Sequence, residues 1–227
     1  MCFSAAGSFT ISALLTGIGA VSMGRGGVKP GRMFAAIPLI FAAQQAAEGL
    51  VWLTIDDARH AVLHRVAVNA FLGVAFVVWP TWLPCSLLLL ERNSERRRSL
   101  TLLFWFGSLA AMYASLLLLV WPPSARVAGH CLAYDHPMIH DEARLLLHLC
   151  GYVVASVVPF FVSTAALART LGGTLIVSLA AAFLVQRDAL TSVWCFFAAV
   201  LSILVLVAVG RQQQPGMPLG EAVARTS

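Results

Sequence analysis

Charged residues are scarce in this chain. Of its 227 residues, 11% are charged and 59% are hydrophobic, whereas about a quarter of an ordinary soluble domain is charged. The mean hydropathy of +0.85 is typical of a protein embedded in a membrane. The long apolar runs also lack the alternation of polar and apolar residues that marks β-barrel strands, so the spans are expected to be helical.

Lysine is nearly absent. Lys29 is the single lysine and is expected in a loop, so no helix offers an amine for a retinal Schiff base. The chain also lacks a glycine-rich nucleotide-binding loop, and its two halves lack the similarity seen in inverted-repeat transporters. These absences exclude several classes of membrane protein and leave open whether the protein is an enzyme.

The apolar runs predict an all-α, polytopic bundle of about seven transmembrane helices, because about 20 helical residues cross a bilayer core. The expected spans lie near residues 5–24, 33–55, 62–90, 100–121, 144–168, 170–186 and 189–210. The sixth is short and contains Gly172 and Gly173, so six spans remain an alternative. Residues 1–210 are expected to form one domain, and residues 211–227 a disordered cytoplasmic tail.

Positive charges gather in the loops on one side of the expected bundle, with Arg96, Arg97 and Arg98 as the densest group. These loops and the tail carry twice as many Lys and Arg residues as the other side. The positive-inside rule therefore places the N-terminus outside and the C-terminus in the cytoplasm. The net charge of +5 then reports topology and gives no sign of a nucleic-acid partner.

Prolines interrupt the third run, where the stretch "WPTWLPC" at residues 79–85 contains Pro80 and Pro84. Each proline removes a backbone donor and disturbs the carbonyl four residues earlier, so a kink or break is expected there. Pro38 and Pro159 are expected to disturb their helices more mildly.

A polar stripe marks the second run, in the stretch "FAAQQAAEGLVW" at residues 41–52. Gln44, Gln45 and Glu48 share one helical face with Phe41 and Trp52. A carboxylate facing lipid costs a few kcal/mol, so Glu48 is expected to face the bundle interior in the outer leaflet. The stripe either lines a functional pocket or hydrogen-bonds neighbouring helices as structural glue.

Soft metal ligands gather on the outer side. Every histidine and four of the five cysteines are expected there: His60, His64, His130, His136, His140, His148, Cys2, Cys131, Cys150 and Cys195. His60 and His64 have helical i, i+4 spacing, which suits one metal but needs further ligands. Cys2 and Cys131 are candidates for a disulfide in an oxidising exterior.

Several motifs carry a resemblance to a known family. The stretches "MCFSAAGSF", "FAAQQAAEGLVW", "WPTWLP" and "SVWCFFAA" resemble those of an uncharacterised family of bacterial multipass membrane proteins, a domain of unknown function. The resemblance spans the whole chain and implies a seven-helix protein of the bacterial inner membrane. It supplies no activity.

Three hypotheses follow. The first is an outer-leaflet site for zinc or copper, because thiolate, imidazole and carboxylate groups bind such ions; its ligands would come from Cys2, Glu48, His64, His148 and Cys195. The surrounding polar pocket would be formed by Gln44, Gln45, Glu48, Trp52 and Trp194. The second is proton- or ion-coupled transport. The third is a non-catalytic accessory subunit that binds lipid, another membrane protein or a second copy of the chain.

Overall fold

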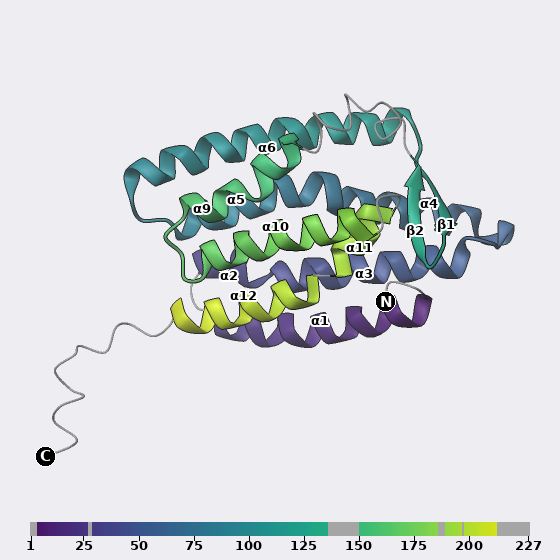
Figure 1. Cartoon of the computed structure of the whole chain (residues 1–227), viewed down its shortest axis with the longest axis horizontal. Coiled ribbons are helices and arrows are strands. Elements are labelled where there is room, and N and C mark those ends of the chain that lie inside the picture. Colours follow the sequence, from purple (N-terminus) through teal and green to yellow (C-terminus); the bar gives the residue numbers. More distant parts are fainter. Residues whose placement is uncertain (1–3, 27–28, 136–149, 186–188, 197, 213–227) are drawn as a thin grey trace, which may run out of the picture.

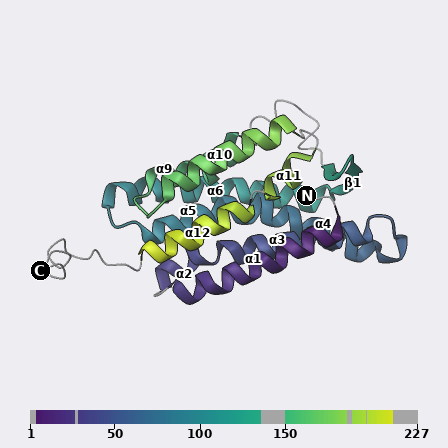
Figure 2. The same cartoon turned by 60° about the horizontal axis from the view of Figure 1, so that its bottom comes forward.

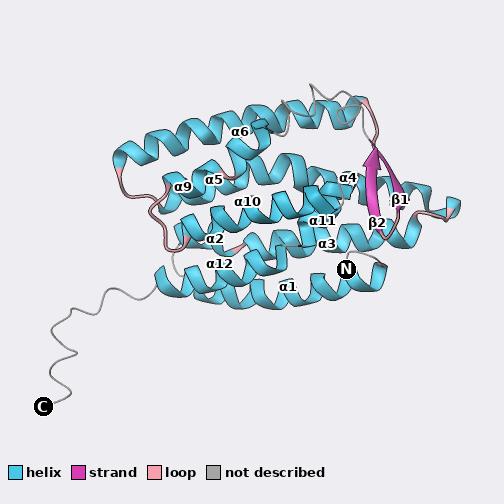
Figure 3. Cartoon of the chain, in the orientation of Figure 1, coloured by secondary structure: helices cyan, strands magenta, loops and turns pink. Residues whose placement is uncertain are grey.

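The computed structural model describes residues 4–26, 29–135, 150–185, 189–196 and 198–212. These residues are mostly helical, and one β-hairpin joins two of the helical segments (Figure 3). The prediction of a helical bundle is therefore confirmed in its main feature. The hairpin was not predicted.

Four helical segments in the first half are long and apolar enough to cross a membrane: Ala5–Arg25, Pro30–Thr54, Ala58–Leu90 and Ser94–Val120. Breaks subdivide the second and third. The elements are α1 (Ala5–Arg25), α2 (Lys29–Ala35), α3 (Ile37–Thr54), the 3₁₀ turn η1 (Ala58–His60), α4 (Ala61–Gly73), the π-helical turn η2 (Val74–Val78), α5 (Trp79–Leu90) and α6 (Ser94–Val120).

The second half begins with the hairpin, formed by the antiparallel strands β1 (Ser124–Ala128) and β2 (Cys131–Asp135). Three shorter apolar helices follow, at Cys150–Val162, Ala168–Leu184 and Leu201–Arg211. They correspond to α9 (Val158–Val162) with the helical turns before it, α10 (Ala168–Val185) and α12 (Ala198–Gln212), and the short helix α11 (Leu190–Phe196) precedes α12.

The helices lie side by side and run between two ends of the molecule (Figures 1 and 2). One end carries the α5–α6 connection, the α9–α10 connection and the end of α12. The other carries the hairpin, the α3–α4 connection and α11. The loops that hold most of the arginines are therefore gathered at one end, and the polar stripe of α3 lies toward the opposite end.

The hairpin and the break in the last run differ from the predicted pattern. Gly129 has a φ of +62°, a conformation that glycine adopts without steric cost, and it turns the chain between β1 and β2. The run at 189–210 is split into α11 and α12, which run in different directions in Figure 1. Both features lie next to the polar stripe.

Two clusters of buried apolar residues hold the bundle together. The larger joins α2, α5, α9, α10 and α12, and its biggest members include Phe34, Trp79 and Phe160. The smaller lies under the hairpin and joins α3 and α4 to β2. Its members are Ala47, Val51, Ala67, Val68, Phe71, Leu72, Leu132 and Tyr134. The hairpin is thus packed onto the bundle through β2.

The expected disturbance near Pro80 is present as the π-helical turn η2. Trp79 donates its backbone N–H to the carbonyl of Val74, five residues earlier, which accommodates the proline ring that follows. Pro84 has no N–H to offer the carbonyl of Pro80. Gly107 of α6 packs directly against that carbonyl oxygen, so the freed carbonyl lies where α5 and α6 approach each other most closely.

Gly107→Ala should destabilise the protein by roughly 1–3 kcal/mol, the usual cost of overpacking. A Cβ at this position would overlap the Pro80 carbonyl oxygen, and backbone cannot move aside as a flexible side chain does. Thermal unfolding in detergent measures the loss. Gly73→Ala is the matched control, because a Cβ there meets nothing within 4 Å. Equal melting temperatures for the two variants would contradict the close approach.

Glu91 connects two loops at the arginine-rich end. Its side chain is 2% exposed, and its carboxylate accepts hydrogen bonds from the backbone of Arg92 and Asn93. Across the bundle, Thr164 donates its backbone N–H at 2.7 Å and its hydroxyl at 2.9 Å. Desolvation acts to raise the pKa of Glu91, but these hydrogen bonds outweigh it and the net pKa is lowered. The ionised form therefore holds the α5–α6 and α9–α10 loops together.

Glu91→Gln should lower stability at neutral pH by about 1–3 kcal/mol, because an amide presents fewer acceptor sites to these donors. Since the folded pKa lies below the ordinary value of 4.5, the stabilisation is complete above pH 4.5 and is lost as the pH falls through the folded value. The difference between wild type and variant should therefore shrink on acidification. Melting curves across this range test it, with the exposed Glu95→Gln as control; a constant difference would contradict it.

Candidate functional site

The polar stripe of α3 is completely buried. Gln44, Gln45 and Glu48 have no exposed surface. The helix is covered closely here, since the ring of Phe9 from α1 lies 2.8 Å from where a Cβ of Gly49 would be. A side chain at position 49 would have to displace this ring, so Gly49 allows Phe9 to pack closely against α3.

Glu48 is held by two neutral donors from two helices. The Ser192 hydroxyl of α11 donates to Oε1 at 2.5 Å, and the Gln45 amide donates to Oε2 at 3.1 Å. The first contact joins residues 144 positions apart in the sequence. Among the described residues, no ion pair includes this carboxylate.

Gln45 leaves one polar atom unused. Its Nε2 donates to Glu48, while its Oε1 is buried and has no hydrogen-bond partner within the described part of the chain. Buried acceptors are rarely left without a donor. The amide therefore places a free acceptor beside a carboxylate, in a region otherwise packed with apolar side chains.

Gln44 links the stripe to the third helical segment. Its Oε1 accepts the indole N–H of Trp79 at 3.0 Å, and its Nε2 donates to the backbone carbonyl of Phe71 at 3.4 Å. These two partners lie on opposite sides of the π-helical turn η2. Phe41 completes the contact, because its ring lies 4.1 Å from that of Trp79.

The hairpin covers the same region from the outside. Tyr134 stacks on Phe71 with ring centroids 4.6 Å apart, and Leu132 is fully buried. Cys131 is a buried free thiol. Burial raises its pKa, and the negative charge of Glu48 raises it further, so Cys131 lies within electrostatic reach of the carboxylate.

The two tryptophans predicted to line the pocket have the following partners in the structure. Trp52 is half-buried and packs against the smaller apolar cluster. Trp194 donates its indole N–H to Ser178 of α10 at 2.9 Å and meets Tyr152 edge to face. On α11 it is Ser192, two residues before Trp194, that reaches Glu48. This serine was not among the predicted site residues, although it opens the motif "SVWCFFAA".

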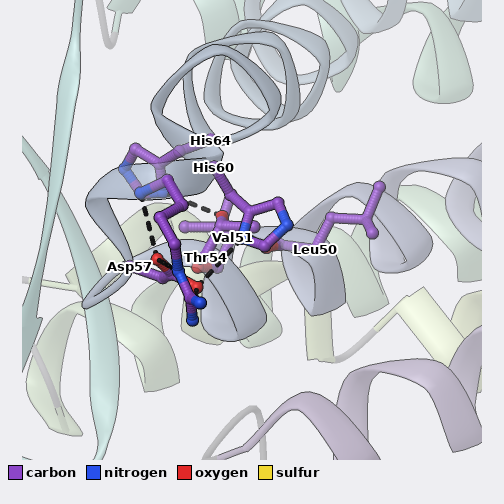
Figure 4. Close-up of polar contacts among 7 residues, drawn as sticks. Leu50, Val51, Thr54, Asp57, His60 and His64 are labelled. Carbon is purple, nitrogen blue, oxygen red and sulfur yellow. Dashed lines mark hydrogen bonds and ion pairs between the residues drawn. The ribbon is translucent and has the colours of Figure 1, made fainter.

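His64 lies at the C-terminal end of α3, beside Thr54 (Figure 4). Its Nδ1 lies 3.0 Å from the hydroxyl of Thr54. That hydroxyl also lies 2.7 Å from the carbonyl of Leu50, to which it donates. His64 therefore links the start of α4 to the last residue of α3.

His60 has a different partner. Its Nδ1 lies 3.0 Å from Oδ2 of Asp57 (Figure 4). Arg59 donates to both oxygens of the same carboxylate. The hydrogen bonds from Arg59, followed by the one from His60, lower the pKa of Asp57. The two histidines of the i, i+4 pair thus make separate contacts at the α3–α4 connection.

The predicted metal ligands are described only in part. Cys2 and His148 lie outside the described residues, and the side chain of Cys195 is not described. Glu48 and His64 have the separate partners given above. Among the residues that the structure describes, no group of three His, Cys, Asp or Glu side chains is placed to hold a metal ion. The ligand set stays a prediction, whereas the disulfide expected between Cys2 and Cys131 is not formed in this structure, because Cys131 is a free thiol.

Ser192→Ala should destabilise the bundle by about 1–2 kcal/mol, because it leaves a buried carboxylate oxygen without its donor. Ser178→Ala is the control, because it removes a hydroxyl that accepts a neutral hydrogen bond from Trp194. The expected loss for this control is about 0.6 kcal/mol, the average for hydrogen bonds between membrane helices. Unfolding in detergent compares the two. A smaller loss for Ser192→Ala than for Ser178→Ala would show that the Glu48 contact adds little.

Comparison with known proteins gives a family but no activity. Neither a curated protein nor a solved structure matches the chain significantly. A family model matches residues 1–219, nearly the whole chain, and its description is "Family of unknown function (DUF6629)". The chain therefore belongs to this family of unknown function.

Proposed function

We propose that the chain is a multipass protein of the bacterial inner membrane, with its N-terminus outside and its C-terminus in the cytoplasm, and that Glu48 binds a proton as part of proton-coupled transport or sensing. Four long and three shorter apolar helices support the membrane placement. The arginines gathered at the end that holds the α5–α6 loop support the orientation.

The observation that carries the proposal is the complete burial of Glu48 among neutral donors. Desolvation of an ionised carboxylate costs several kcal/mol in a low-dielectric interior, and two neutral hydrogen bonds do not compensate for that cost. Acidic groups in such positions take up a proton, pair with a cation or face a hydrated path. A site for a positive ion is therefore the simplest role for this side chain.

The unused oxygen of Gln45 supports a proton as that ion. With Glu48 ionised, the Gln45 amide donates to it, as observed. If Glu48 gains a proton on Oε2, a half-turn of the amide brings the free Oε1 to accept it. The pair is then hydrogen-bonded in both protonation states without any movement of the helices, which is what repeated loading and release of a proton requires.

A soft metal ion is the second candidate, and Cys131 is the observation that favours it. A buried thiol and the buried carboxylate of Glu48 are of the sulfur and oxygen types that zinc accepts as ligands. Copper is the other ion that such ligands suit. Cys2, His64, His148 and Cys195 remain the proposed sources of further ligands.

Glu48→Gln and Glu48→Leu distinguish these roles. The glutamine variant keeps an acceptor for Ser192 and should fold with nearly unchanged stability, whereas the leucine variant removes the carboxylate that accepts from Ser192 and Gln45 and should lose about 1–3 kcal/mol. If Glu48 binds a proton, the infrared band of a buried protonated carboxyl should appear on acidification of the wild type and be missing from Glu48→Gln.

Metal analysis of the same proteins, purified without a histidine tag, tests the second candidate. A metal present in the wild type and lost in both variants would favour zinc or copper over a proton. If the wild type and Glu48→Gln give the same infrared spectra and metal content, and only Glu48→Leu is unstable, Glu48 is a structural residue and both proposals fail.

A further inference from the structure

A second feature lies at the opposite end of the molecule, on the outer surface of α6. This helix runs along the edge of the bundle (Figure 1). A shallow groove of about 600 Å³ lies against its first two turns and is lined by Ser94, Arg97, Arg98, Thr101 and Leu102. These positions follow the i, i+3, i+4, i+7 spacing of one helical face, so a single stripe of side chains forms the groove.

The two arginines bring positive charge that nothing in the described structure neutralises. Arg97 is fixed in place, since its guanidinium donates to the backbone carbonyls of Leu88 and Glu91. Arg98 is exposed and, within the described residues, makes neither a hydrogen bond nor an ion pair; the neighbouring Glu95 does not pair with it. The groove thus presents one preorganised and one free guanidinium.

The same stripe continues as an apolar face. Leu102 is 71% exposed, and the positions that follow it at helical spacing are also exposed and apolar, namely Trp105, Leu109, Met112 and Leu116. A helix of 27 residues is about 40 Å long and exceeds the bilayer core of about 30 Å. The arginine end therefore extends into the headgroup layer while the apolar face stays among the acyl chains.

We propose that this groove binds an anionic phospholipid of the surrounding leaflet. The lipid phosphate is bound by Arg97 and Arg98, whose planar guanidinium groups suit phosphate oxygens. The acyl chains lie along Leu102 and the exposed apolar face below it. The proposal rests on the membrane placement given above and is independent of any role for Glu48.

Arg98→Gln tests the site, with Arg92→Gln as the matched control. Arg92 is exposed in the same loop region and its substitution changes the net charge equally. Full-length protein in detergent is mixed with equal amounts of phosphatidylglycerol and phosphatidylcholine, and native mass spectrometry counts the retained lipids. Wild type should retain phosphatidylglycerol preferentially. Arg98→Gln should reduce the retention of phosphatidylglycerol about fivefold, because it removes one arginine from the site. Arg92→Gln should reduce it less than twofold.

A second variant, Leu102→Gln, tests the apolar wall. Its side chain is largely exposed, so the fold should persist while phosphatidylglycerol retention falls. Equal retention of both lipids by the wild type would overturn the proposal. So would equal losses in Arg98→Gln and Arg92→Gln, since the arginines would then act only as general surface charge. Complete displacement of the lipid by inorganic phosphate would also overturn it, because it would mark a site for a free anion.

Discussion

Polar groups buried in a bundle of long apolar helices must find their partners within the protein, and this constraint explains most of the contacts described here. Where a proline or a break frees a backbone carbonyl, another element supplies a donor or a close contact. The carbonyl of Met33, near the break before Pro38, accepts the indole N–H of Trp82. At the arginine-rich end, Arg96 donates to the carbonyl of Val162 where α9 ends. The helices are thus joined at their irregular points.

The same constraint made much of the fold predictable. Long apolar runs with prolines at known places predicted the long helices and the disturbance before Pro80, because chain length and missing donors act locally. The stripe of α3 was also predictable as buried, since the helical period places Gln44, Gln45 and Glu48 on one face. Burial of all three confirms this part of the prediction.

The partners of those side chains could not be predicted, because they depend on long-range packing. Ser192 lies 144 positions from Glu48, and no local pattern distinguishes it from other serines in apolar helices. Glu91 was overlooked for a related reason: it follows an apolar run and precedes arginines, so it resembles an ordinary loop charge. Its burial depends on Thr164, from a loop 73 positions away. The hairpin was missed because the segment around it reads as a polar loop.

The π-helical turn between α4 and α5 has a consequence for helical register. A π turn takes up one residue more than an α-helical turn would, so the side chains before and after it belong to faces rotated relative to each other by about 100°. Gln44 bonds to Phe71 on one side of this rotation and to Trp79 on the other. Reversion of the turn to regular α-helix would swing Trp79 away from Gln44, so a single amide side chain fixes the phase between the two halves of the segment.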